Sequence, residues 1–504
     1  MGQEFVQTIK EGYAFAGPAL EVGRAIRGGK VFPDLPVAVP FAMINRHGLV
    51  AGATGTGKTK TLQLMAGKLS DAGVPVFLAD LKGDLSGISK AGVAKEAVQA
   101  RCKELGVSFA AKGHPVEFLS LTGKQGAQVR ATVSSFGPLL LAKVLDLNET
   151  QQGVMTLLFK FCDDQHLPIL DLPDLKAVMS HLIGLDSKQL AGYGGMSKAA
   201  LGVLNRKLVE LEQQGADVFL GEPEFNIHDL LRVTPDGKGM ITILSLTDIQ
   251  DRPALFSTFM MWLLGELFHQ LPERGDVEKP VLVFFFDEAH LLFEEASKAL
   301  LNQIEQVVKL IRSKGVGVYF VTQTPKDIPA DVLAQLGNRF EHALRAFTPD
   351  DAKALKATAG TFPRTPFYDI EKELTSLGIG EALITVLDAQ GRPTPVVATR
   401  LLPPDSLMGA LDPPDFEAAV RAGSLQGKYA QSIDRESARE ILHDKMATPV
   451  GAGASAAPAD DLRGPGWKDS AASMAKGILK SPLTRQIGRE VVRGIFGMLK
   501  KNLK

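Results

Sequence analysis

Two stretches of this chain combine residue types that bind and cleave phosphate esters. The first runs from Leu49 to Thr59 as a short apolar strand followed by a glycine-rich loop, Gly52-Ala-Thr-Gly-Thr-Gly-Lys-Thr59. Its glycines permit backbone conformations with positive φ, so successive N–H groups can converge on phosphate oxygens. A helix that begins near Lys58 adds its N-terminal amides and its dipole to the attraction for an anion. The loop therefore predicts a phosphate-binding site.

The side chains that close this loop predict a nucleotide and a metal ion. Lys58 can reach the β- and γ-phosphates of ATP, and Thr59 can offer its hydroxyl to Mg²⁺. An ordinary glycine-rich turn is the alternative, but a strand precedes the loop and a helical segment, Thr61 to Leu69, follows it. The predicted nucleotide-binding residues are Gly52, Thr54, Gly55, Thr56, Gly57, Lys58, Thr59 and Lys60.

The second stretch is a continuous apolar run, Val281 to Phe286, that ends in Asp287-Glu288-Ala289-His290. Such a run is typical of a parallel strand that is covered on both faces, and ligands of these sheets bind at the carboxyl ends of the strands. We expect Asp287 to hold Mg²⁺ through its water shell and Glu288 to polarise the attacking water. His290 is interpreted as a neighbour in the turn.

Residues beyond the two motifs are candidates for sensing and stabilising the phosphates. Gln323 ends the apolar run Val316 to Thr322 and is the candidate γ-phosphate sensor, although it also fits a turn before Pro325. Arginine supplies positive charge to a transferring phosphoryl group. Three arginines are predicted to lie near the same edge of the sheet, and we expect at least one of them to serve in this way: Arg312, Arg339 and Arg345.

Asp80-Leu81-Lys82-Gly83-Asp84 follows another predicted strand, Val74 to Ala79. Asp80 could approach the outer shell of the metal ion, and Lys82 could face a substrate. A polar turn stabilised by glycine explains the same residues, and both interpretations stay open.

The elements that position these residues alternate between strands and helices. Further strands are predicted at Met240 to Leu246, His342 to Phe347 and Glu381 to Leu387, which implies a mainly parallel α/β sheet. The predicted parts are a strand-rich segment at 1–40, an α/β core at 41–136 and 234–402, a helical insertion at 137–233, a helical extension at 403–448, a flexible linker at 449–466 and a basic amphipathic helix at 467–504. In the insertion, a leucine stripe at Leu201, Leu204, Leu208 and Leu211 predicts a bundle core.

Composition limits the class of protein. The 504 residues include 56 Lys and Arg against 57 Asp and Glu, so a nucleic-acid contact has to come from a local patch. Two cysteines, Cys102 and Cys162, lack metal-like spacing and fit a reducing compartment. Because no secretory leader or membrane span is evident, we expect a cytoplasmic protein.

The basic amphipathic helix after Ser473 leaves three uses open. It can pack on protein, bind nucleic acid, or lie on an anionic membrane surface, which would place the protein peripherally at the membrane.

With these motifs, the chain resembles the HerA/FtsK superfamily of P-loop ATPases, and within it the bacterial HerA-like proteins. The matching stretches are Gly52 to Thr59, Asp80 to Asp84, Phe286 to His290, Ile311 to Gly315, Val321 to Pro325 and Gly380 to Leu383. The resemblance implies a RecA-like fold, a homo-hexameric ring with nucleotide between subunits, an arginine donated across the interface, and movement of DNA or another polymer. The short N-terminus departs from the DNA-repair members.

The function that we expect is therefore Mg²⁺-dependent ATP hydrolysis coupled to translocation or remodelling of DNA. The alternative is an ATP-dependent assembly or scaffold protein that is held at a membrane by its C-terminal helix.

Overall fold

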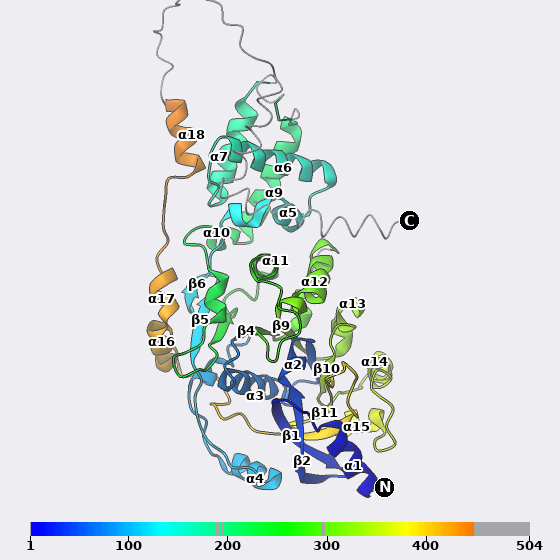
Figure 1. The fold of residues 1–504 in the computed structure, drawn as a ribbon. Coiled ribbons are helices and arrows are strands. Elements are labelled where there is room, and N and C mark those ends of the chain that lie inside the picture. The colour runs from blue at the N-terminus through cyan, green and yellow to red at the C-terminus, as the bar shows by residue number, and fades with distance from the viewer. Residues whose placement is uncertain (1, 187–191, 194–195, 294–297, 448–504) are drawn as a thin grey trace, which may run out of the picture. The chain divides into compact units, whose positions relative to one another are not determined.

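The computed structural model describes residues 2–186, 192–193, 196–293 and 298–447 (Figure 1). The predicted linker at 449–466 and the basic helix at 467–504 lie outside these ranges. The described residues form two compact units. The first contains 2–130, 214–219 and 223–432, and the second contains 131–213, 220–222 and the described residues from 433 onward. The boundaries drawn from the sequence stay predictions.

The first unit is built on one large sheet with the strand order β2-β1-β12-β11-β10-β3-β9-β8-β4-β7-β5-β6. Neighbouring strands are parallel from β10 to β6 and antiparallel from β2 to β10. The strands are β1 (Ala19–Arg27), β2 (Lys30–Pro40), β3 (Gly48–Ala51), β4 (Val76–Asp80), β5 (Val116–Ser120), β6 (Ala127–Gln128), β7 (Ile241–Ser245), β8 (Leu282–Phe286), β9 (Val316–Thr322), β10 (Asn338–Glu341), β11 (Glu381–Thr385) and β12 (Val397–Leu401).

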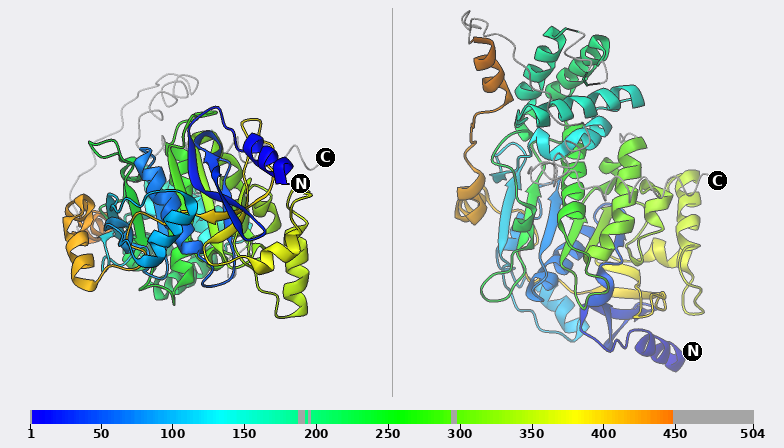
Figure 2. Two further views of the ribbon diagram at one scale, coloured as in Figure 1. Left: turned by 90° about the horizontal axis from the view of Figure 1, so that it is seen from below. Right: turned by 45° about the horizontal axis from the view of Figure 1, so that its top comes forward.

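Helices cover both faces of this sheet (Figure 2). The helices of the first unit are α1 (Gly2–Gly12), α2 (Phe41–Ile44), α3 (Lys58–Asp71), α4 (Glu96–Leu105), α10 (Ala216–Phe219), α11 (Pro253–Gln270), α12 (Lys298–Ile311), α13 (Ala330–Leu333), α14 (Pro349–Ala359), α15 (Ile370–Ser376), α16 (Pro413–Ala422) and α17 (Ser424–Tyr429). No helix of the described residues is long and apolar enough to cross a membrane.

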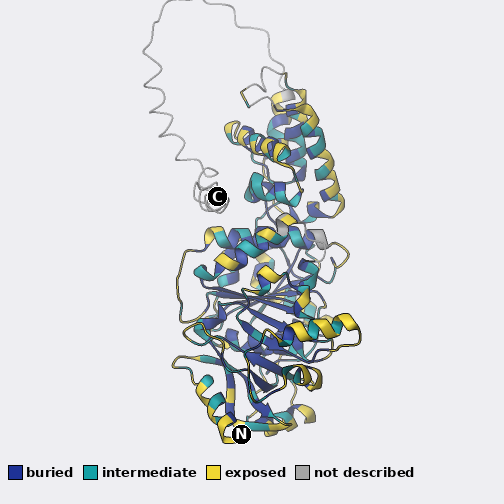
Figure 3. Cartoon of the chain, turned by 90° about the vertical axis from the view of Figure 1, so that its right-hand side faces the viewer, coloured by how far each residue is buried: buried dark blue, intermediate teal, exposed yellow. Residues whose placement is uncertain are grey.

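The central strands confirm the sequence prediction of a doubly covered sheet. Every residue of β4, β7, β8 and β9 is buried. Figure 3 shows the interior of the sheet in dark blue, between helices with exposed outer faces. The prediction of a strand at 342–347 is wrong. The strand at this place is β10, which ends at Glu341, and its polar residues do not form the apolar run that is typical of a buried strand.

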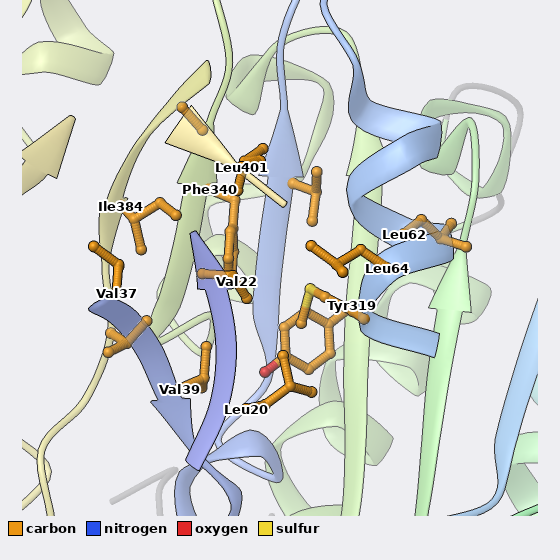
Figure 4. Packing of buried hydrophobic residues seen from close by; sticks show 14 of the residues in the cluster. Leu20, Val22, Val37, Val39, Leu62, Leu64, Tyr319, Phe340, Ile384 and Leu401 are labelled. Carbon is orange, nitrogen blue, oxygen red and sulfur yellow. The ribbon is translucent and has the colours of Figure 1, made fainter. Parts of the chain in front are cut away.

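The antiparallel end of the sheet is closed by the hairpin β1–β2. Val22 and Val39 of this hairpin pack in one apolar cluster with Leu62 of α3, Tyr319 of β9 and Phe340 of β10 (Figure 4). The outermost strand, β2, carries three prolines, Pro33, Pro36 and Pro40. Because proline lacks an N–H group, this edge offers an incomplete set of hydrogen-bond donors.

The second unit is helical. Its helices are α5 (Val133–Val144), α6 (Glu149–Asp164), α7 (Leu172–Gly184), α9 (Lys198–Gln213) and α18 (Ala438–Ala447). The predicted leucine stripe lies on α9 and is buried at all four positions, which confirms that it belongs to the core of this bundle.

Candidate functional site

The glycine-rich loop joins β3 to α3, and its backbone has the conformation that the sequence predicts. Gly52, Gly55 and Gly57 have φ values of 151°, 81° and 115°. Space is restricted as well at Gly52, where a Cβ atom would lie 2.5 Å from the Cβ of His342. At Gly55 no atom lies within 4 Å of such a Cβ, so glycine serves the backbone conformation alone.

Lys58 begins α3 and folds back over the loop. Its Nζ donates hydrogen bonds to the carbonyl oxygens of Gly52 at 2.6 Å and Ala53 at 3.2 Å. Burial lowers the pKa of Lys58, and the charges of Glu288 and Asp287 act against this lowering. The ammonium group is therefore close enough for the charges of the acid pair to affect it, although Lys58 and Asp287 are 229 positions apart in the sequence.

The strand order explains how the two motifs meet. A single strand, β9, lies between β3 and β8, and all three run parallel. The loop follows the last residue of β3 and the acid pair follows the last residue of β8, so both lie at the same edge of the sheet.

The two carboxylates of the acid pair have different environments. Burial, and then the charge of Glu288, raise the pKa of Asp287 to about 7. Burial alone would raise the pKa of Glu288, but the hydrogen bond and charge of Lys82 hold it below its usual value. Glu288 has φ of 49°, a left-handed conformation that is uncommon outside glycine. His290 lies beside it, with 3.4 Å between its Nδ1 and Oε2 of Glu288.

The turn after β4 is held by Asp80 and brings Lys82 to the acid pair. The Asp80 carboxylate accepts hydrogen bonds from the backbone N–H groups of Lys82, Gly83 and Leu85 at 3.2, 2.7 and 3.1 Å. Burial raises the pKa of Asp80 to about 6, against the effect of these bonds. Asp80 thus shapes the turn, and the turn places the Lys82 ammonium on Glu288.

Gln323 follows β9 and is exposed at the edge between the loop and the acid pair. Its neighbours are fixed by Asp327, whose carboxylate accepts hydrogen bonds from the Thr322 hydroxyl at 2.8 Å and the Thr324 N–H at 3.1 Å. The end of β9 is therefore held by side-chain hydrogen bonds, while Gln323 itself is exposed.

The three candidate arginines do not lie together, and the prediction that all are near the phosphate-binding edge is wrong for two of them. Arg312 precedes β9, and Arg339 is the second residue of β10, so both lie toward the opposite edge. Arg339 donates to the Thr361 hydroxyl there at 2.6 Å. Arg345 follows β10 and is exposed on the phosphate-binding side, where the carbonyl oxygen of Ala343 accepts a hydrogen bond from Ala53.

His342 is a residue of this site that the sequence prediction missed. It is fully buried, its Nε2 lies 2.9 Å from the Thr61 hydroxyl of α3, and its backbone N–H donates to Ala51 at 2.7 Å. Burial lowers the pKa of His342 to about 3, so the ring is neutral. His342 packs against Gly52 of the loop and against α3, and so supports the loop. Its position, as a polar residue directly after a strand, could have identified it. The predicted strand began at His342 itself, so this position was not recognised.

The sequence is similar to that of known proteins with DNA-helicase names. The family model described as "Helicase HerA-like C-terminal" matches residues 28–504. The chain is similar to the DNA double-strand break repair helicase HerA of Sulfurisphaera tokodaii, with 23% identity over 372 residues that cover 71% of this chain and 66% of that protein. For its counterpart in Saccharolobus solfataricus the identity is 20% over 366 residues, covering 71% and 65%.

The chain thus spans just under two thirds of the length of these relatives. Among solved structures, the plasmid coupling protein TrwB in complex with the ATP analogue ADPNP is similar, with 16% identity, coverage of 77% of this chain and 96% of that one, and a TM-score of 0.47.

The strand order, the phosphate loop and the acid pair at one edge make the first unit a RecA-like P-loop fold, as the sequence predicts. Together with a family match over nearly the whole sequence, this shows that the chain belongs to the HerA-like helicase C-terminal family.

Proposed function

We propose that this chain is an ATPase that uses Mg²⁺ and couples hydrolysis to the movement or remodelling of DNA. One observation carries the proposal. Lys58 and the acid pair lie at the same edge of the sheet, close enough for the charges of Glu288 and Asp287 to act on the Lys58 ammonium. Lys58 and the loop amides bind the phosphates, Asp287 holds the metal ion, and Glu288 accepts a proton from the attacking water. Gln323 contacts the γ-phosphate.

The residues present fit a hydrated Mg²⁺ ion. Oδ2 of Asp287 is buried, and nothing in the described part of the chain donates a hydrogen bond to it. A carboxylate with a raised pKa gains most from a nearby cation, because the cation favours its ionised form. Thr59 would supply the hydroxyl ligand. Bound there, Mg²⁺ would neutralise charge that develops on the phosphates.

A ring of six subunits is part of the proposal. Arg339 and Arg312 lie toward the edge opposite their own phosphate loop, so neither is placed to reach nucleotide in the same subunit. A neighbouring subunit could present either of them. The named relatives are DNA double-strand break repair helicases, which favours DNA as the polymer.

The test measures ATP hydrolysis by the full chain with and without duplex DNA. We expect stimulation by DNA, and DNA affinity that falls steeply as salt rises, because phosphate contacts release counterions. Lys58→Ala should weaken ATP binding itself. Glu288→Gln should retain bound ATP while hydrolysis falls by about 100-fold or more, since the base contributes about that factor.

Two results would count against the proposal in different ways. Normal turnover by Glu288→Gln would show that the base is misassigned. Hydrolysis that DNA leaves unchanged, together with DNA affinity insensitive to salt, would exclude DNA as the polymer and favour the assembly role suggested by the sequence.

A further inference from the structure

A short loop before β11 lies directly against the phosphate loop. The Gly380 N–H donates a hydrogen bond to the carbonyl oxygen of Thr56 at 2.9 Å. A Cβ atom on Gly57 would lie 3.2 Å from the Gly380 nitrogen, so the two loops are in close contact. Residues 378–380 therefore form one continuous surface with the site proposed for phosphate.

The backbone of this loop is fixed from two sides. Arg101 of α4 donates hydrogen bonds to the carbonyl oxygens of Ile379 at 2.8 Å and Gly380 at 3.3 Å. The Glu381 carboxylate accepts a hydrogen bond from the Gly378 N–H at 2.7 Å and pairs with Arg400 at 2.8 Å. The Ile379 side chain is nevertheless 72% exposed. A fixed backbone thus presents a large apolar side chain to solvent.

The strand order indicates which part of a bound nucleotide would lie near Ile379. The acid pair follows β8, on one side of β3, while β10 and β11 lie on the other side. The terminal phosphate has to face the acid pair, so the nucleoside end of the molecule leads away from it. At a spacing of about 4.8 Å per strand, β11 lies roughly 10 Å from β3 in that direction.

We propose that the Ile379 side chain is the surface on which the base of the bound nucleotide packs. The inference rests on the proposed function, because it takes the phosphates to lie on the loop. An aliphatic side chain covers the flat face of a base and forms no hydrogen bond with its edge. The contact is therefore insensitive to the identity of the base, and it supports ATP and GTP alike.

The experiment compares two ligands that share phosphates and differ in the base. Binding of MgATP and of magnesium tripolyphosphate is measured by titration calorimetry on the full chain and on Ile379→Ala. We expect the Kd for ATP, and equally for GTP, to rise about five- to tenfold through lost apolar contact. The Kd for tripolyphosphate should stay within about twofold of wild type.

Val233→Ala is the matched control. Val233 is also aliphatic and 50% exposed, but it lies in the turn before β7 and so toward the opposite edge of the sheet. This variant should bind both ligands like wild type. In Ile379→Trp, the indole should change its fluorescence on adding MgATP and not on adding tripolyphosphate.

Unchanged ATP affinity in Ile379→Ala would overturn the inference, because the base then packs elsewhere. Equal weakening of ATP and tripolyphosphate would overturn it too, since Ile379 would then only support the phosphate loop. Both results leave the proposed ATPase standing. Failure of the wild-type chain to bind either ligand would instead remove the proposed function, and the inference with it.

Discussion

The contact between Lys82 and Glu288 decides in which pH range the proposed base is ionised. Lys82 lowers the pKa of Glu288 against the effect of burial, and a carboxylate has to be ionised to accept a proton. Activity is therefore lost as the pH falls through the pKa of Glu288. Replacing Lys82 by methionine removes the charge that lowers this pKa.

In Lys82→Met, the acid limb of the kcat profile should therefore move to higher pH. The measurement is ATP turnover at saturating ATP across the acid to neutral range. Lys112→Met is the control, because Lys112 also forms ion pairs, with Asp71 and Asp405, and takes no part in the proposed chemistry. Coincident acid limbs in wild type and Lys82→Met would show that Lys82 does not set the protonation of the base.

Site residues that belong to a contiguous motif could be predicted from the sequence. Site residues that depend on a partner far away in the sequence could not. The loop at Gly52 to Thr59 and the pair Asp287-Glu288 are complete within a few positions, so their types and spacing identify them. Lys82 and Glu288 are 206 positions apart. Nothing in either segment specifies the other as its partner, because the order of β4 and β8 in the sheet brings them together.

Among the elements, the phosphate loop offers a direct test of packing. Gly52→Ala places a methyl group 2.5 Å from the Cβ of His342, whereas Gly55→Ala meets open space. Both substitutions carry a backbone cost of about 1 kcal/mol, and overpacking adds about 1–3 kcal/mol for Gly52→Ala alone. Urea unfolding should show the larger loss of unfolding free energy for Gly52→Ala. Equal urea midpoints would mean that the loop can move away from His342.

Apolar strands were predictable, and polar or peripheral elements were not. The apolar run at Val316–Thr322 coincides with β9, and the other buried strands differ by one or two residues. The strand β10 contains Asn338, Arg339 and Glu341, which are polar side chains that packing buries or half-buries. The helix α1 was not predicted, and its two buried residues, Phe5 and Ile9, give only a short periodic signal.

For the whole molecule, the position of Arg339 predicts complementation between subunits. Mixing Arg339→Ala with Lys58→Ala should restore part of the ATPase activity that each lacks alone. In a mixed ring, a Lys58→Ala subunit still presents Arg339 to the intact phosphate loop of its Arg339→Ala neighbour. Turnover is measured across mixing ratios.

Arg345→Ala in place of Arg339→Ala is the comparison. Because Arg345 lies on the side of its own phosphate loop, mixing this variant with Lys58→Ala should add no activity beyond that of the Arg345→Ala subunits alone. Mixtures of Arg339→Ala that stay inactive at every ratio would remove Arg339 as the arginine donated between subunits. The place of each arginine along its strand decides which edge of the sheet it lies toward. Arg312 precedes β9, and Arg339 is the second residue of β10, so both lie away from the carboxyl ends that face the phosphates.

The prolines of β2 constrain how copies of this chain can join. Three backbone donors are missing from β2, and the strand at the far end, β6, is only two residues long, so both edges disfavour the regular addition of a further strand. Contacts between copies would then depend on side chains from helices and loops. Contacts of this kind can shift without breaking backbone hydrogen bonds between strands, so under the proposed function neighbouring copies could change their relative orientation during ATP hydrolysis.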